Sequence, residues 1–211
     1  MKRLAIALML PGLLILGFLA WQSVVKNASD SQNEAREIIM QNIEANAQPK
    51  NSVHPPVYPW TNVAPVAVIK PKKIKVGSKY VSSVGLISIP KIGVKNEPVV
   101  DDFTQAALDA SLIGSMGDPG EGNFVVIAHV VGHGAVFKNL RRLRKNDLVM
   151  VKTASGKFTY RIRGGPVTIK DTDTEVLRGS SKKIISLITC AEVFHTDKRI
   201  AVFGDLVKRT P

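Results

Sequence analysis

The stretch that decides the fold is Ile184-Ile185-Ser186-Leu187-Ile188-Thr189-Cys190. Its apolar run is typical of a buried β-strand, and it follows the charged pair Lys182-Lys183. The strand delivers the only cysteine of the chain to its C-terminal end. Because a cysteine is mostly protonated at neutral pH, a reactive one needs a nearby cation that favours the thiolate.

Arg199 is a candidate for that cation. A loop of residues 191–198 follows the cysteine, and a second apolar run, Ile200-Ala201-Val202-Phe203, begins directly after the arginine. If the two runs pair as neighbouring strands, Cys190 leaves one strand at the edge where Arg199 enters the next. The alternative is a small buried cysteine and an exposed surface arginine, and this segment alone does not decide between the two.

The composition limits the classes of partner. The chain has 211 residues, which is room for one domain of about 100 to 150 residues with appendages. Its net charge of +12 suggests a nucleic-acid partner, but the sequence has no arginine-clustered helix, aromatic stacking platform or zinc-ligand spacing. We therefore expect no nucleic acid, and anionic cell-surface polymers or lipid headgroups fit the charge better. A single cysteine forms no intramolecular disulfide, so we expect a free thiol.

Residues 1–26 are predicted to form an N-terminal transmembrane anchor. Lys2 and Arg3 precede an uncharged stretch from Leu4 to Val25, which is long enough to span a membrane as a helix of about 20 residues. A cleaved signal peptide is the alternative, but no Ala-x-Ala-like site ends the run. The sequence thus predicts a single-pass protein of the cell membrane whose folded part lies outside the cytoplasm.

Residues 27–80 are predicted to form a stalk helix and a linker rich in proline and lysine. The segment Ser31-Gln32-Asn33-Glu34 matches a capping box and predicts the start of the helix. A thin apolar stripe on this helix would consist of Ala35, Ile38, Ile39, Asn42 and Ile43. From Pro49 to Lys75 the composition favours an extended spacer that lifts the domain off the membrane.

Residues 81–211 are predicted to form the folded domain, and its fold class is mainly β. Short alternating or apolar runs are separated by turn signals, and one short helix is expected at Thr104–Leu112. The expected strands are residues 85–90, 94–100, 123–128, 147–151, 157–162, 167–169, 184–188 and 200–207, and residues 114–122 are expected to form a turn-rich loop. Seven or eight short strands with one or two short helices indicate a closed β-barrel.

A histidine ends another of these strands. The run Asn123–Ala128 ends at His129, just as the apolar run described first ends at Cys190. His133 follows four residues later, but a metal-binding pair at this spacing needs a helix and a third ligand, and the pattern shows neither. We therefore expect no metal site.

With His129, Cys190 and Arg199 each at a strand end, the chain resembles the sortases, the membrane-anchored cysteine transpeptidases of bacterial cell surfaces. The likeness runs from about Gly85 to Val207. The segments that carry it are Leu86-Ile87-Ser88-Ile89-Pro90, residues 119–129, Phe137-Lys138-Asn139-Leu140, Asp173-Thr174-Glu175-Val176-Leu177 and Ser186-Leu187-Ile188-Thr189-Cys190. The resemblance implies a closed eight-stranded β-barrel. The short interval from Cys190 to Arg199 is similar to sortases with a compact loop there, of the class D, E or F kind.

The resemblance also implies the roles of the site residues. Cys190 would attack a Leu-Pro-x-Thr-Gly-like sorting signal after its threonine and form a thioester, with His129 as general acid and base. Arg199 would donate hydrogen bonds to the substrate or the developing oxyanion. Thr189 and Ala128 are expected to bind substrate, although Ala128 stands where the family usually has glycine. No cofactor is needed for this chemistry.

The implied partners are surface proteins that carry the sorting signal and an amine acceptor, either a cell-wall precursor or a pilin lysine. Two alternatives remain open. One is a thiol peptidase that only hydrolyses, with water as the acceptor. The other is a catalytically silent sortase-like domain that binds protein tails or anionic wall polymers through its basic surface.

Overall fold

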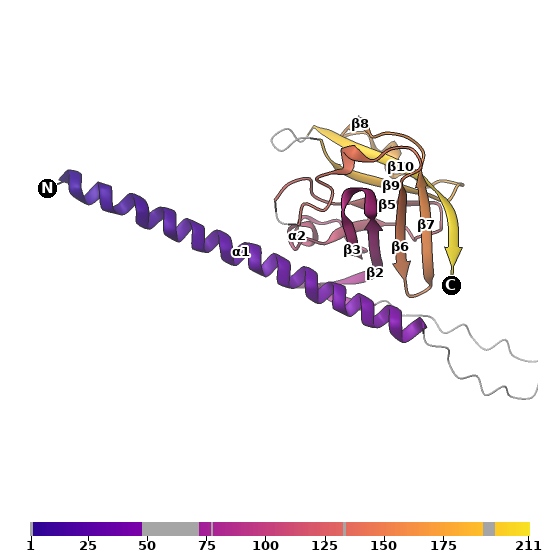
Figure 1. Ribbon diagram of the computed structural model, residues 1–211, viewed down its shortest axis with the longest axis horizontal. Coiled ribbons are helices and arrows are strands. Elements are labelled where there is room, and N and C mark those ends of the chain that lie inside the picture. The colour runs from indigo at the N-terminus through magenta and orange to yellow at the C-terminus, as the bar shows by residue number, and fades with distance from the viewer. Residues whose placement is uncertain (1, 48–71, 77, 133, 192–196) are drawn as a thin grey trace, which may run out of the picture.

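The computed structural model describes residues 2–47, 72–76, 78–132, 134–191 and 197–211, and within the first helix the side chains of Phe18 and residues 20–46. A long helix, α1 (Lys2–Ala47), passes along one side of a β-domain and extends well beyond it (Figure 1). The predicted linker falls on residues 48–71, which lie outside the described residues.

Ten strands occur in the described part of the chain, and eight of them close into a barrel. Around the barrel the order is β2, β3, β4, β5, β9, β10, β7 and β6, and β6 pairs with β2 to close the ring. The strands of the ring are β2 (Lys79–Ile89), β3 (Val94–Val100), β4 (Ile113–Met116), β5 (Asn123–Ile127), β6 (Leu148–Thr153), β7 (Gly156–Ile162), β9 (Ile184–Cys190) and β10 (Lys198–Thr210). Two further strands, β1 (Lys73–Val76) and β8 (Val167–Lys170), pair with β2 and β10. The predicted eight-stranded barrel is confirmed.

The seam between β2 and β6 depends on a glycine. A Cβ atom at Gly85 would collide with the backbone carbonyl oxygen of Lys152, so any larger residue would push the two strands apart. The β2–β6 ladder then runs from Leu86 opposite Lys152 to Ser88 opposite Met150. Close approach of two backbones at a strand glycine is one way in which a sheet can turn to close a barrel.

The short helices are α2 (Gln105–Asp109) and three 3₁₀ turns, η1 (Pro90–Ile92), η2 (Leu140–Arg142) and η3 (Thr174–Leu177). The helix predicted at Thr104–Leu112 is confirmed in a shorter form, with Thr104 at its N-cap position. The loop predicted at residues 114–122 is wrong for its first residues, which belong to β4. β4 is too short and too rich in glycine to show a strand pattern, and it is stabilised by parallel pairing with β3 and antiparallel pairing with β5.

The barrel interior is filled by side chains from nearly every strand and from the loop that follows β5. The largest of its fully buried side chains include Phe124, Phe137 and Tyr160. The Tyr160 hydroxyl oxygen accepts a hydrogen bond of 2.7 Å from the Gly120 backbone N–H. Burial raises the pKa of Tyr160 to about 12, and the Gly120 hydrogen bond offsets only part of this shift.

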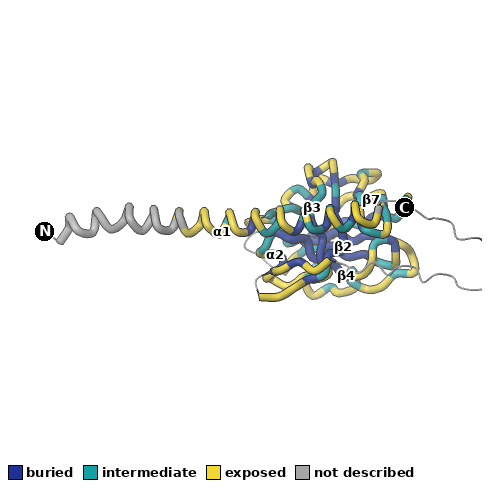
Figure 2. Tube along the Cα trace, turned by 90° about the horizontal axis from the view of Figure 1, so that it is seen from below, coloured by how far each residue is buried: buried dark blue, intermediate teal, exposed yellow. Residues whose placement is uncertain are grey.

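The second half of α1 packs on the outside of the barrel, and Figure 2 shows this part of the helix lying across the domain. Ala35, Ile39 and Ile43 are almost fully buried, and their four-residue spacing places them on one face of the helix. Their partners are outward-facing residues of β1, β2 and β3 and residues around α2, namely Ile74, Val76, Val81, Leu86, Val100, Ala107 and Leu112. The Arg36 guanidinium adds an ion pair of 2.9 Å with Glu97 of β3.

This packing differs from the expected stalk. The apolar stripe was predicted and three of its members are buried, but the helix does not begin at Ser31 and instead runs continuously from Lys2. No cap is needed at Ser31, because the preceding helical turns supply carbonyl partners for the N–H groups there. Because α1 contacts the domain before the linker begins, the linker does not separate the helix from the domain. The strand β1 and the start of β2 also lie before the expected domain boundary at residue 81.

The transmembrane anchor predicted at residues 1–26 falls mostly on residues whose side chains lie outside the description, so it stays a prediction. No helix in the described part of the chain is long and apolar enough to cross a membrane.

We expect replacement of Ile39 by alanine to destabilise the protein by about 2 to 5 kcal/mol, because it removes a buried side chain from the contact between α1 and the barrel. The matched control is Glu37→Ala on the exposed face of the same helix, which should change stability by less than about 0.5 kcal/mol. Urea unfolding of the chain from Lys26 to Pro211 measures both. Equal midpoints for the two variants would show that docking of α1 contributes no stability.

We expect Tyr160→Phe to remove part of the alkaline sensitivity of the fold. The tyrosine pKa is about 12 in the folded protein and about 10 when unfolded, so ionisation favours the unfolded state as the pH rises above 10. In wild type the free energy of unfolding should therefore fall between pH 9 and pH 11 by more than in the variant. Denaturant titrations across this range measure the difference. Parallel pH curves for the two proteins would contradict the assignment.

Candidate active site

The parallel pair β5 and β9 brings two of the predicted site residues to one edge of the barrel. The two strands are in register from Asn123 opposite Ile184 to Ile127 opposite Ile188. Beyond the last pair, the Ala128 N–H donates a hydrogen bond of 3.3 Å to the Ile188 carbonyl oxygen. Parallel strands end on the same side, so His129 and Cys190 lie on neighbouring strand ends.

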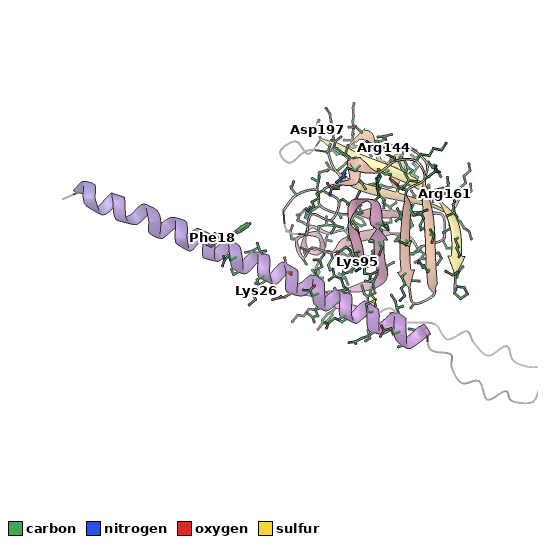
Figure 3. All side chains as sticks on the ribbon, in the orientation of Figure 1. Phe18, Lys26, Lys95, Arg144, Arg161 and Asp197 are labelled. Carbon is green, nitrogen blue, oxygen red and sulfur yellow. The ribbon has the colours of Figure 1, made fainter. Side chains whose placement is uncertain are left out.

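The third residue comes from the other side of β9. β10 runs antiparallel to β9, with Arg199 directly opposite Cys190. This confirms the pairing of the two apolar runs that the sequence suggested. Figure 3 labels Asp197, which directly precedes β10 and marks this edge of the barrel. The histidine, cysteine and arginine are thus carried by three adjacent strands, with the cysteine in the middle.

Thr189 holds the first two of these strand ends together. Its side chain is 2% exposed, and its hydroxyl donates a hydrogen bond of 2.7 Å to the Ala128 carbonyl oxygen. The bond joins the residue before Cys190 to the residue before His129. A buried, satisfied hydroxyl of this kind fixes local geometry, because breaking the bond would leave polar atoms unpaired. The substrate-binding role of Thr189 and Ala128 stays a prediction.

Cys190 is a free thiol that is partly exposed. Arg199, which has its backbone directly opposite, is also partly exposed, so it stands at the same edge as a permanent cation.

Hydrogen bonds hold His129 at its backbone carbonyl oxygen and at its ring. The Phe137 N–H donates a hydrogen bond of 3.2 Å to the His129 carbonyl oxygen, which closes the loop of residues 130–136. The side chain is 25% exposed, and Nε2 lies 3.3 Å from Oδ1 of Asp109, the last residue of α2. No sequence pattern pointed to Asp109, because 20 residues separate it from His129.

Arg141 is a second residue that sequence reasoning missed. It belongs to a basic cluster that also contains Arg142, Arg144 and Lys145, and it is exposed to solvent. Its guanidinium donates a hydrogen bond of 2.9 Å to the carbonyl oxygen of Ala191, the residue after Cys190. Buried Phe137 and Leu140 place η2 against the core and so direct this arginine to the end of β9. In the sequence, the three-residue spacing of Phe137 and Leu140 was the one signal that a turn packs here against the core.

The described residues show no metal cluster at the three site residues. Among the described residues, no group of histidine, cysteine, aspartate and glutamate side chains could hold a metal ion. His133 and His195 lie outside the described residues. A cavity of about 520 Å³ lies between the start of β2, the loop before β5 and the β6–β7 turn, and its lining includes Asn42, Asp118 and Ser155. This cavity does not reach Cys190.

Comparisons with known proteins find relatives of this chain in sequence and in structure. The sortase domain model matches residues 87–207. Sortase A of Bacillus anthracis is 30% identical over 127 residues, which are 59% of this chain and 60% of that protein. Sortase SrtE2 of Streptomyces coelicolor is 27% identical over 144 residues, which are 60% of this chain and 57% of that protein. The chain spans about three fifths of the length of these relatives.

Solved structures share the barrel. A sortase D5 transpeptidase of Clostridium perfringens superposes with a TM-score of 0.54 at 28% identity, covering 60% of this chain and 80% of that one. Sortase A of Listeria monocytogenes superposes with a TM-score of 0.55 at 24% identity, covering 61% of this chain and 91% of that one. The second likeness concerns the fold alone.

We expect Arg141→Ala to loosen the end of β9. The lost hydrogen bond has a charged donor but is partly exposed, so the cost of local opening should fall by about 1 kcal/mol. Amide exchange of residues 189–191 should then become about fivefold faster. Arg142→Ala is the matched control, since Arg142 is exposed and adjacent. Hydrogen exchange followed by mass spectrometry measures both, and equal exchange in the two variants would contradict the role given to Arg141.

Proposed function

The chain belongs to the sortase family, and we propose that it is a cysteine transpeptidase that cleaves a sorting signal and transfers the cleaved protein to an amine. The observation that carries the proposal is the placement of His129, Cys190 and Arg199 at the ends of three adjacent strands. A nucleophile, a general acid and base, and a fixed cation are the groups that acyl transfer needs.

In the first half-reaction the Cys190 thiolate attacks the carbonyl carbon of the scissile peptide bond. The carbonyl oxygen becomes an oxyanion, to which the Arg199 guanidinium donates hydrogen bonds. The C–N bond then breaks, and protonated His129 gives its proton to the departing amine. The products are a thioester on Cys190 and a free peptide that begins with the residue after the cleaved bond.

In the second half-reaction an amine attacks the thioester carbonyl. His129, now neutral, accepts the proton that the amine loses, and the sulfur leaves as the thiolate. A new amide bond forms, and both side chains return to their starting protonation states. Water as the acceptor would give a carboxylic acid instead, which is the reaction of a hydrolase.

The substrate class follows from family membership. The signal would be a Leu-Pro-x-Thr-Gly-like peptide cut between threonine and glycine, at the C-terminal end of a surface protein. The acceptor would be a cell-wall precursor or a pilin lysine. The Clostridium perfringens relative is described as a transpeptidase, which supports transfer as the main reaction. The compact interval between Cys190 and Arg199 supports a class D, E or F type.

The arrangement of α1 supports a place at the membrane surface. If residues 4–25 span the membrane, the helix reaches the hydrogen bond between Gln32 and Glu97 of β3 about 9 Å after Lys26. Figure 3 shows Phe18 on the part of α1 beyond the barrel, and Figures 1 and 2 place α2 on the side toward which the helix extends. Because α2 contacts His129, the active site would face the membrane at short range.

The test is to incubate the full chain in detergent micelles with Leu-Pro-x-Thr-Gly and Leu-Ala-x-Thr-Gly peptides, with and without triglycine. We expect intact-mass spectrometry to show an acyl adduct on wild type and none on Cys190→Ala, followed by a ligated product when triglycine is present. Arg199→Lys keeps the charge but loses the planar fork, so it should form the adduct more slowly.

The other outcomes separate the alternatives. Hydrolysed peptide with no ligation at any amine concentration would indicate a thiol peptidase. Absence of an adduct with every peptide, from a protein that is folded, would contradict catalysis and favour a binding domain.

A further inference from the structure

The Asp109 side chain forms a hydrogen bond with the His129 ring. Oδ1 of Asp109 lies 3.3 Å from Nε2 of the ring. A carboxylate only accepts hydrogen bonds, so the hydrogen between the two atoms belongs to Nε2. In a neutral imidazole the other nitrogen, Nδ1, then carries the lone pair.

The carboxylate is itself held in place. The Gln105 side-chain amide donates a hydrogen bond of 2.6 Å to the same Oδ1 atom, four residues along α2. One oxygen thus accepts from two donors, one on the helix and one on the active-site ring. This arrangement fixes the orientation of the carboxylate.

The helix that carries Asp109 is wedged between two other elements. On the side that faces the domain, α2 contributes Ala107, which is fully buried in the same apolar cluster as Ile39 of α1. Ser111 lies two residues after the end of α2, and a Cβ atom at Gly134 would collide with it. Gly134, in the loop after His129, therefore lies directly against the C-terminal end of α2. Asp109 therefore has little freedom to move away from the histidine.

We propose that Asp109 is a positioning residue, which holds His129 through Nε2–H so that Nδ1 is the nitrogen that exchanges protons with substrate. The proposal rests on the transpeptidase function proposed above and adds the residue that sets which ring nitrogen reacts. A purely structural ion pair is the competing explanation. Because the Asp109 side chain is 62% exposed, such a pair would contribute little to stability, and its loss would leave the chemistry unchanged.

Kinetics on the full chain in detergent micelles test the proposal. In Asp109→Asn the rate constant for acylation of Cys190 in a single turnover should fall about fivefold, equivalent to about 1 kcal/mol, with little change in the peptide concentration for half-saturation. Asp109→Glu, which restores a carboxylate, should recover part of the rate. Asp118→Asn is the matched control, because Asp118 is exposed and lies in the loop before β5, at the other end of that strand. Melting temperatures of all four proteins should agree.

A spectroscopic readout is independent of activity. The chain labelled with ¹⁵N-histidine should show His129 with the hydrogen on Nε2 when neutral, and the signal is assigned by its loss in His129→Gln. In Asp109→Ala the fraction with the hydrogen on Nδ1 should rise. Wild type with the hydrogen on Nδ1 would overturn the proposal.

The two levels of inference fail separately. Wild type that forms no thioester would remove the proposed function, whatever the ring tautomer. If Asp109→Asn forms the thioester as fast as wild type, the role proposed for Asp109 is wrong and the proposed transpeptidase function is unaffected.

Discussion

The structure depends above all on the parallel pairing of β5 with β9. In the ring, β5 lies between β4 and β9, and β9 lies between β5 and β10. Both strands are buried along most of their length. Their register places His129 and Cys190 on neighbouring strand ends. The Thr189–Ala128 hydrogen bond holds that register at the C-terminal ends of the two strands. A slip of one residue would turn every side chain of a strand to the opposite face, so burial on both faces makes the register strict. The placement of the proposed catalytic residues and the packing of the core therefore depend on the same strand register.

Around this pair, the supports of the site come from outside the barrel. Arg141 reaches the end of β9 from η2, and Asp109 reaches His129 from α2. α2 in turn packs in the same apolar cluster as α1. The N-terminal helix is thus connected to the active site through two layers of contacts. An element that resembles a simple tether in sequence belongs, by its packing, to the scaffold that holds the histidine.

The sequence predicted those features that depend on short segments. Apolar runs that end in chemically distinctive residues indicated β5, β9 and β10, and the single cysteine left one candidate for a thiol nucleophile. Asp109 and Arg141 were missed for the opposite reason. Each is an ordinary charged residue on a short turn, and each matters through one contact with a residue 20 or 50 positions away. β4 was missed because its stability comes from its neighbours β3 and β5 rather than from its own residues.

The docking of α1 shows why an amphipathic pattern must be considered together with its partner. The stripe of Ala35, Ile39 and Ile43 is too thin to indicate burial by itself, since a solvated stalk could carry it. In β2, however, Leu86 and Ile87 are consecutive, fully buried apolar residues, and consecutive strand residues point to opposite faces. Ile87 fills the barrel, so Leu86 needs a cover on the outside. The apolar surface on the outside of β2 and the apolar stripe on α1 each need a partner that excludes water. Each serves as that partner for the other, so the two surfaces are buried together.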